Sequence, residues 1–496
     1  MDLKENYFWN EFCTINCDML SFFNERFKLC QDLLNDLRLK SWALDRYAPA
    51  ENKPLEDLRN RTAVATNNIG HARRILDEIV STGFNQSVVD CERARNLRRL
   101  IDSIVVGTSD LEISLSQEAL RAKSQLAQTK DYKIFQIEPE LVRAVRSLFD
   151  EASSVIFGRS YNVPETPIPM PVFWPRSDYE YLTNSFAIAV PLSLMHGRRY
   201  HLGAPIPHEI AHAKLAGIGY FYSKMMRPDN DAEKRRSENH LERFIPESTH
   251  ETLSEMCSLE EEFYLDLKMN VGEIYKQLYR KYANDDFCLR QSQAAAQLHE
   301  IICDVVSVTV AGPADVFWCG SVWTDLCGDS THDILNHLED ITHPPAAIRM
   351  EYLLEHLEET GGGRMAFFLK EQARGLTKWR YYPDRATLSD RYFQILRKYR
   401  KRISALVGKL IMERPTSERW NALIETYERC QDHELRSVES DLNAYELVNL
   451  LWFRRGDAFL RWKKSPESKT YLEELRREEP FFEDIRRRLE STRTDQ

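Results

Sequence analysis

The run His208-Glu209-Ile210-Ala211-His212 constrains the local structure of this chain more than any other feature. On a helix, residues i and i+4 lie one above the other on the same face, so His208 and His212 can both reach one point. Two imidazoles at this spacing are typical of zinc ligands, and an acid after the first can deprotonate a zinc-bound water. The run therefore predicts a helical metal site, with Glu209 as its general base.

Prolines and glycines suggest where this helix begins and ends. Pro205 and Pro207 lie just upstream of the run. Since proline is tolerated in the first turn of a helix, we expect the helix to begin at the run itself. We expect Gly217 and Gly219 to end or bend it.

A catalytic zinc needs a third protein ligand and an open position for water. The metzincin continuation is excluded, because Leu215 and Ile218 stand where its glycine and third histidine would be. A better candidate is Glu300, which has Asp304 four residues later in a strongly apolar stretch. Buried carboxylates need a metal or a cation as partner, so we expect Glu300 to bind zinc and Asp304 to support a zinc-bound histidine. The alternative is a helix whose two acids face solvent.

A third segment, Thr342-His343-Pro344-Pro345-Ala346-Ala347-Ile348-Arg349, follows the second helix. Together the three segments resemble the gluzincin metallopeptidases, and are most similar to the superfamily of the CaaX prenyl proteases and the bacterial heat-shock membrane protease. The resemblance implies one Zn²⁺ per chain, with Glu300 as third ligand and Asp304 supporting a zinc histidine. It also implies that His343 lines the site and that Arg349 anchors this segment.

A weaker similarity precedes the first helix. Asn184-Ser185-Phe186-Ala187 resembles the segment of that family which leads into a strand beside the active site. The apolar run 186–191 then reads as a strand, and a plain buried strand is an equally good interpretation. The resemblance covers roughly residues 180–350. The chain departs from the family in having no predicted membrane-spanning helix and a short spacing before His208.

Other residues compete for the role of third ligand. His250-Glu251 lies in a charged stretch between the two metal helices, and His196 and His201 lie just ahead of the first. Each is a weaker candidate than Glu300, because none has a comparable motif around it. Cys13 and Cys17 share a helix face, and either a redox or metal pair or two core-facing thiols would fit.

The predicted fold is mainly α. Residues 1–155 read as a helical domain, and 160–360 as a zincin-like α+β metallopeptidase core with a small sheet and a two-helix zinc site. Residues 361–496 read as a helical C-terminal domain. A charged helical insert is expected at 220–290, as a lid or a gating hairpin. In the C-terminal region, Ile403, Leu406, Val407 and Leu410 have amphipathic helical spacing, and Trp452-Phe453 could be a groove or a buried pair.

Composition excludes several classes of partner. The net charge of −10 disfavours nucleic acid, and no stretch of about 20 uncharged apolar residues predicts a membrane span. Ten scattered cysteines and no apolar leader favour a cytoplasmic protein with reduced thiols. The flanking helical regions suggest a protein partner or an oligomer.

These features predict a zinc endopeptidase acting on a specific protein or peptide substrate, with Glu209 and His343 as catalytic residues. The alternative from another class is a helical interaction or sensor protein in which the metal is structural or regulatory. An acid beside the first ligand favours the enzyme, since a structural site needs no base.

Overall fold

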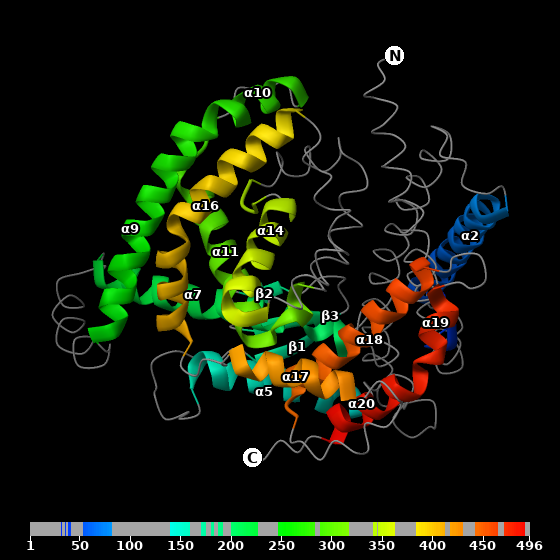
Figure 1. The fold of residues 1–496 in the computed structure, drawn as a ribbon. Coiled ribbons are helices and arrows are strands. Elements are labelled where there is room, and N and C mark those ends of the chain that lie inside the picture. Colours follow the sequence, from blue (N-terminus) through cyan, green and yellow to red (C-terminus); the bar gives the residue numbers. More distant parts are fainter. Residues whose placement is uncertain are drawn as a thin grey trace.

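The computed structural model is mainly helical, with one small sheet, over the residues that it describes (Figure 1). Those residues are 31, 35, 38–40, 53–81, 139–158, 170–174, 180–182, 187–191, 200–226, 247–282, 288–316, 341–344, 346–362, 383–411, 417–429, 442–464 and 471–491. The predicted class, mainly α, is confirmed. The described helices before residue 363 are α2 (Lys53–Ser81), α5 (Pro139–Phe157), η2 (Tyr200–Gly203), α7 (Ile206–Met226), α9 (Glu247–Asn270), α10 (Gly272–Tyr282), α11 (Gln291–Ala311), α14 (Ala346–Leu357) and η3 (Glu358–Gly362). Those nearer the C-terminus are α16 (Pro383–Leu410), α17 (Ser417–Arg429), α18 (Ala444–Lys464), α19 (Tyr471–Arg477) and α20 (Glu479–Ser491).

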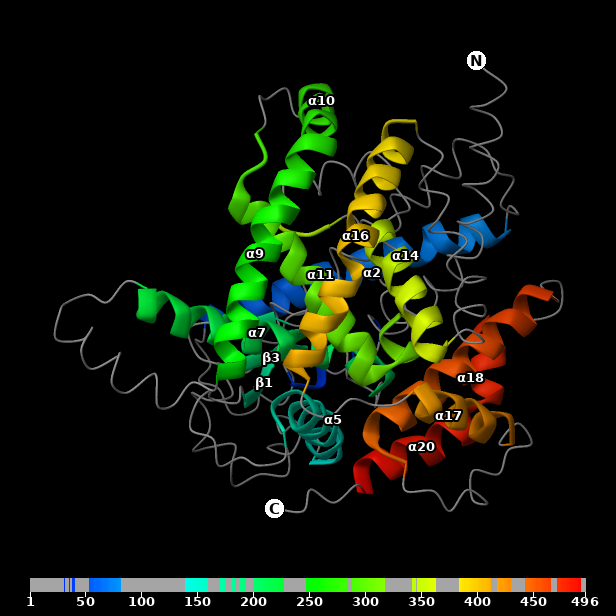
Figure 2. The ribbon, with the colours of Figure 1, turned by 60° about the vertical axis from the view of Figure 1, so that its left-hand side comes forward.

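Helix α11 lies at the centre of the described structure. It packs against α7 on one side and against α9, α14, α16 and α18 on others (Figure 2). Most of its length is buried, including the apolar run Ile301–Val306 and the polar residues Gln297, Glu300 and Asp304. A helix that is apolar all round is stable only when neighbours cover it, which explains its position. Any polar group on α11 must therefore find its partners inside the protein.

The same composition gives α11 the length and hydropathy of a membrane-spanning helix, and it is the one described helix that passes this test. Of its most apolar window, 78% is buried inside the protein. Packing against neighbouring helices accounts for that apolar sequence.

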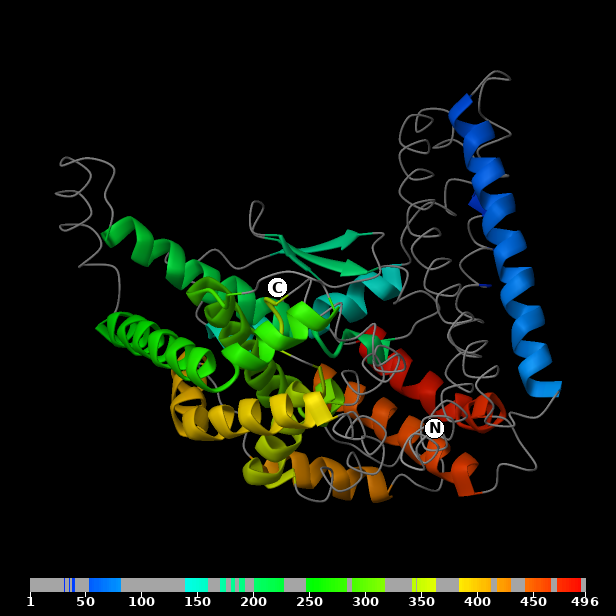
Figure 3. The same cartoon turned by 90° about the horizontal axis from the view of Figure 1, so that it is seen from above.

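The sheet has three short strands in the order β1-β3-β2 and lies against α7 (Figure 3). Strand β3 (Ala187–Pro191) is central, with β1 (Met170–Trp174) parallel to it and β2 (Glu180–Leu182) antiparallel. Ala187 to Val190 are buried, as expected for a central strand. The strand predicted at 186–191 is confirmed from residue 187 onward, whereas Asn184 to Phe186 lie outside the described residues.

Helix α7 begins at Ile206, so Pro207 lies in its first turn as predicted. The Pro205 carbonyl accepts hydrogen bonds from the backbone N–H groups of His208 and Glu209, at 3.0 and 3.4 Å. The helix then continues through Gly217 and Gly219 to Met226, so of the two predicted effects, ending or bending the helix, the first is wrong. Glycine inside a helix costs about 1 kcal/mol relative to alanine, an amount that tertiary packing can offset.

The charged insert predicted at 220–290 contains α9 and α10, and its charges face α16. Arg402 of α16 donates to Glu255 at 2.7 Å and to Glu262 at 2.8 Å, and Lys398 donates to Asp266 at 2.5 Å. The opposite face of α9 buries Leu253, Met256, Leu259, Phe263 and Leu267 against the core. Helix α9 therefore packs along one side of the core, and these acidic side chains pair with α16.

The C-terminal helices share the core with the rest of the described chain. Ile403, Leu406, Val407 and Leu410 are all buried, so the predicted amphipathic face of α16 is confirmed. Trp452 and Phe453 of α18 are also buried, which favours a buried pair over an open groove. Residues of α5, α7, α11, α16, α18 and α20 belong to one hydrophobic cluster. The pair Cys13 and Cys17 lies outside the described residues.

The carboxyl end of α11 is held by two side chains from the C-terminal helices. Asn449 is fully buried, donates to the Ala311 carbonyl at 2.7 Å and accepts from the Ala314 N–H at 2.7 Å. Gly312 has φ +67° and ψ −149°, a conformation essentially restricted to glycine. A Cβ atom at Gly312 would lie 2.6 Å from the ring of Trp420.

Replacing Gly312 with Ala should therefore destabilise the fold. Backbone strain and the clash with Trp420 together predict a loss of about 2–4 kcal/mol, measured as a lower midpoint of urea or thermal unfolding. Gly70→Ala is the matched control, because a Cβ at Gly70, inside α2, meets nothing within 4 Å. It should stabilise by about 0.5–1 kcal/mol. Equal midpoints for Gly312→Ala and the unmodified protein would contradict this account.

Candidate metal centre

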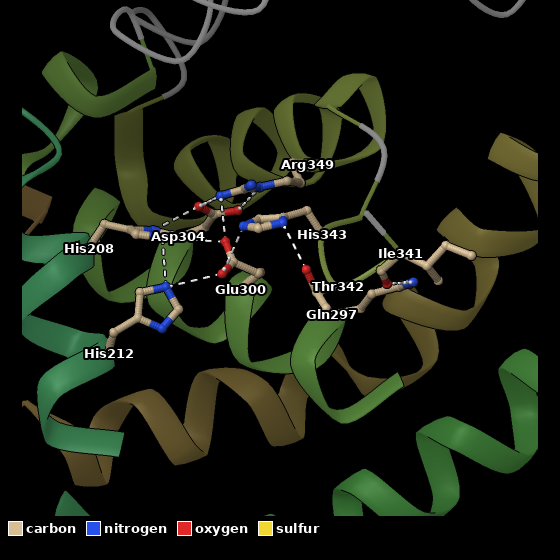
Figure 4. A network of polar contacts seen from close by, with 9 residues as sticks. All are labelled: His208, His212, Gln297, Glu300, Asp304, Ile341, Thr342, His343 and Arg349. Atoms are coloured by element: carbon tan, nitrogen blue, oxygen red, sulfur yellow. Dashed lines mark hydrogen bonds and ion pairs between the residues drawn. The ribbon is translucent and has the colours of Figure 1, made fainter. Parts of the chain in front are cut away.

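The crossing of α7 and α11 brings three possible metal ligands together (Figure 4). His208 and His212 lie one turn apart on the face of α7 that packs on α11, and Glu300 faces them from α11. One donor atom from each lies within 4.8 Å of the other two. All three side chains are mostly buried, with Glu300 only 11% exposed. This group can hold a metal ion.

The spacing of the donor atoms fits a small ion. His208 Nε2 and His212 Nε2 are 3.0 Å apart, and Glu300 Oε1 is 3.1 Å from His212 Nε2. Glu300 Oε2 is 3.4 Å from His208 Nε2. Ligands around a tetrahedral ion with bonds of about 2.0–2.1 Å stand roughly 3.3 Å apart. The donor set of two imidazoles and one carboxylate is that of a catalytic zinc site, and other divalent ions also accept it.

Asp304 orients the first histidine from behind. Its Oδ1 lies 3.1 Å from His208 Nδ1, which leaves Nε2 of the same ring facing His212 and Glu300. Such a carboxylate partner fixes the tautomer of a metal-binding imidazole and raises its basicity. Asp304 is buried, and the cation that balances its charge is mostly buried, with 11% of its side chain exposed.

That cation is Arg349 of α14. Its Nε donates to Asp304 Oδ2 at 2.7 Å and its Nη2 to Asp304 Oδ1 at 2.6 Å, which makes a bidentate pair. The same Nη2 lies 3.3 Å from Glu300 Oε2. One guanidinium therefore positions both carboxylates of α11, which extends the anchoring role that the family resemblance implied.

These contacts set the protonation of the metal-free cluster. Burial alone would raise the pKa of Glu300, but hydrogen bonds from His208 and His212 lower it below its usual value. Burial likewise raises the pKa of Asp304, but the Arg349 charge and the hydrogen bonds with His208 and Arg349 together lower it below its usual value. Burial lowers the pKa of His208, whereas hydrogen bonds to Asp304 and Glu300 raise it well above 6.5. Both carboxylates are thus ionised, as metal binding requires.

Glu209 and His343, the two predicted catalytic residues, lie at the same crossing. Glu209 follows His208 on α7 and is partly buried. The pKa of the Cys303 thiol of α11 is raised first by burial and then by the charges of Glu300, Asp304 and Glu209. His343 approaches from the loop before α14, with Nε2 3.4 Å from Glu300 Oε1, and 48% of its side chain is exposed. Solvent or a ligand can reach this ring.

The two rival ligands whose side chains the structure describes, His201 and Glu251, lie elsewhere. His201 of η2 is buried edge-on against Trp452, whose Nε1 donates to the His201 carbonyl at 2.7 Å. Glu251 is exposed on α9, 3.8 Å from Lys409. His196, and the side chain of His250, lie outside the described residues.

Two residues of this network were missed by sequence reasoning. Gln297 is fully buried three residues before Glu300, and it donates to the Ile341 carbonyl at 2.7 Å. Thr342 Oγ1 lies 3.1 Å from His343 Nδ1. The one available signal was periodicity, because i and i+3 share a helix face and so place Gln297 beside Glu300. Neither residue type belongs to a recognised motif.

Comparison with protein-family models, with curated proteins and with solved structures finds no match to this chain.

Replacing Glu300 with Ala should remove the metal site while leaving the helices in place. With one of three ligands lost, affinity for added Zn²⁺ should fall by more than about 100-fold, since loss of an outer partner alone costs about 10–100-fold. Metal per chain after equilibrium dialysis measures this. Glu251→Ala, which changes an exposed glutamate of α9, is the matched control and should bind Zn²⁺ as before. Equal zinc content in the two variants would exclude Glu300 as a ligand.

Asp315, just beyond α11, gives a pH-dependent prediction. It is buried, its Oδ2 has no hydrogen-bond partner among the described residues, and burial together with repulsion by Asp304 raises its pKa to about 7. In the unfolded chain the Asp315 carboxyl ionises near pH 3.8. In the folded protein it stays protonated up to about pH 7, so the folded state is increasingly disfavoured as pH rises from 4 to 7. Relative to Asp315→Asn, the metal-free protein should lose about 4 kcal/mol over that window, at about 1.4 kcal/mol for each unit of pKa shift. Urea unfolding of both proteins across this range tests it, and parallel stability curves would contradict it.

Proposed function

We propose that this protein is a zinc-dependent endopeptidase that hydrolyses peptide bonds of a protein or peptide substrate. The observation that carries the proposal is the meeting of His208, His212 and Glu300 at one point, with Glu209 next to the first histidine. Among the described residues this metal-binding group has three members. Three protein ligands and one remaining position for water is the arrangement of catalytic zinc sites.

Zinc, when bound, supplies a water whose pKa is lowered to about 7 and a positive charge beside the reacting carbonyl. Glu209 would accept a proton from a water held at this site as the water oxygen attacks the carbonyl carbon. It then delivers the proton to the amine nitrogen as the C–N bond breaks. His343 donates a hydrogen bond from Nε2 to the carbonyl oxygen, which becomes negative in the tetrahedral intermediate.

The position of His343 supports this last role. Thr342 Oγ1 is within hydrogen-bond distance of Nδ1, so in the tautomer where the hydroxyl donates to Nδ1 the proton of the ring sits on Nε2. That nitrogen faces the metal cluster. The ring is about half exposed, so it can meet a substrate without rearrangement of the core.

The same residues support membership of the gluzincin class with a zincin-like core. Helix α7 carries the two histidines, α11 carries Glu300 and Asp304, and the segment 341–349 brings His343 and Arg349 to them. A small sheet lies beside the histidine helix. The spatial meeting of three segments that are far apart in the sequence supports the resemblance, which was drawn from motifs alone.

The geometry of the sheet limits where an extended substrate could pair with it. A substrate pairing with the strand at 186–191 is excluded over Ala187–Ala189, because β1 and β2 already occupy both edges of β3 there. Strand β2 lies against α7 and pairs only with β3 among the described strands. An extended peptide would therefore add to the outer edge of β2 (Glu180–Leu182), where backbone hydrogen bonds can hold it.

The remaining expectations form part of the same proposal. We infer a cytoplasmic enzyme, in keeping with Cys288 and Cys303, which form no disulfide among the described residues. Its targets are specific proteins, and the helical regions flanking the core contact a partner or a second copy. A net charge of −10 disfavours nucleic acid as a ligand.

Glu209→Gln should retain zinc and lose proteolysis, because the amide has nearly the same shape but cannot accept the proton. Loss of general-base catalysis predicts a fall in kcat of about 10²–10⁴-fold. The measurement uses unfolded casein and a library of fluorescence-quenched peptides, with zinc content determined on the same samples. Glu251→Gln is the matched control.

Undiminished cleavage by Glu209→Gln would remove Glu209 from the mechanism. A different result would be tight zinc binding by the unmodified protein and by Glu209→Gln, with no cleavage of any probe by either. It would favour the other class of function, an interaction or sensor protein with a regulatory metal. In that case X-ray absorption of the zinc-loaded protein should show a fourth protein ligand in place of water.

A further inference from the structure

The loop segment that carries His343 has little regular structure of its own. Ile341 and Pro344 are buried, whereas Thr342 and His343 between them are exposed. The ring of His343 nevertheless lies 3.4 Å from Glu300. A side chain on such a segment is placed reliably only when its backbone is fixed to a rigid element.

Gln297 makes that connection (Figure 4). Its Nε2 donates to the Ile341 carbonyl at 2.7 Å, two residues before His343. A carbonyl can only accept, so the amide nitrogen must face Ile341 and the amide oxygen must point the other way. Gln297 thus ties the loop to the same helix, α11, that carries Glu300 three residues later.

The orientation of the Gln297 amide is itself fixed by buried tyrosines. The Tyr392 hydroxyl of α16 donates to Gln297 Oε1 at 2.6 Å. Tyr275 of α10 is fully buried, which raises its pKa, and a hydrogen bond with Gln297 acts in the opposite direction. A flipped amide would turn its oxygen away from the Tyr392 hydroxyl and against the Ile341 carbonyl oxygen, which would then have no donor. The amide therefore has one favourable orientation.

We propose that Gln297 is a positioning residue that holds the segment 341–344 so that His343 faces the metal centre. The inference rests on the proposed function for the role of His343, but not for its location. The polar partners of Gln297 are the Ile341 carbonyl, Tyr392 and Tyr275, none of which is a metal ligand, so its link to His343 runs through the Ile341 carbonyl. Since α11 carries both Gln297 and Glu300, one helix sets the distance between His343 and Glu300.

The test uses Gln297→Met, which has a similar volume but no donor. Spectra of protein with ¹⁵N-labelled histidine are recorded with and without Zn²⁺, and the His343 signals are identified by their absence in His343→Gln. In Gln297→Met we expect the His343 signals to shift or broaden. The signals that change when Zn²⁺ binds, from His208 and His212, should keep their positions, and zinc per chain should stay at the unmodified level.

Tyr392→Phe is the second variant, and it keeps the inference testable if Gln297→Met does not fold. It removes the hydroxyl that orients the amide but leaves the bond to Ile341, so a smaller shift of the same His343 signals is expected. Unchanged His343 signals in both variants would overturn the proposal. So would a common shift of all the site histidines, because that would indicate a general structural role.

Once a peptide that the protein cleaves is known, enzyme kinetics test the positioning role of Gln297 independently. Gln297→Met should lower kcat with little change in KM, and by no more than His343→Gln, for which about 10²-fold is expected of a lost oxyanion donor. The double variant should be no slower than His343→Gln alone, because both changes remove the same interaction. Additive losses would contradict positioning through His343. The spectra do not require proteolysis, so failure of this inference and failure of the proposed enzyme can be told apart.

Discussion

Two ionised carboxylates inside an apolar helix are the constraint on which the rest of this structure depends. Glu300 and Asp304 lie on the buried face of α11, where an unpaired charge would cost several kcal/mol. Arg349 balances one of the two charges through its bidentate contact with Asp304. The second needs another positive charge between Glu300 and the two histidines. A proton on His208 supplies it in the metal-free protein, and a divalent ion supplies it better.

The cluster is held together by elements that come from well outside it in sequence. Lys214 of α7 donates to the carbonyls of Ile156 and Leu410, at the ends of α5 and α16, and so fixes the histidine helix from both flanks. Asn449 and Trp420, from α18 and α17, close the end of α11. Such contacts explain why the helices flanking the core in sequence share one hydrophobic cluster with it. A metal centre with donor atoms 3.0–3.4 Å apart requires this degree of fixation.

The metal ligands and His343 come from different kinds of local structure. The ligands come from two long helices packed against each other, whereas His343 comes from the segment 341–344, which is not helical. Gln297 removes that difference by linking the segment to α11 inside the protein. The outcome is a buried set of ligands beside a half-exposed imidazole, which suits a reaction on a substrate that arrives from solvent.

Much of this arrangement was predictable from the sequence, because it depends on local periodicity. The i, i+4 spacing fixes His208 beside His212 and Glu300 beside Asp304 whenever the segments are helical. Amphipathic spacing correctly predicted the buried face of α16, and an apolar run predicted β3. The joining of the Glu300 helix to the histidine helix was inferred from resemblance, since no rule of spacing connects residues about 90 positions apart.

Only the tertiary structure decided which partners these residues meet. That β3 is central, with both edges occupied over Ala187–Ala189, depends on strands that pair with it from elsewhere in the chain. Helix α7 continues past Gly217 because packing outweighs the weak helix propensity of glycine. Gln297 reads in sequence as an ordinary polar residue, and the Ile341 carbonyl gives it its role. The sequence by itself determined the helices and the chemistry that they carry. The contacts between distant segments had to come from the folded chain, because such contacts leave no local period to read.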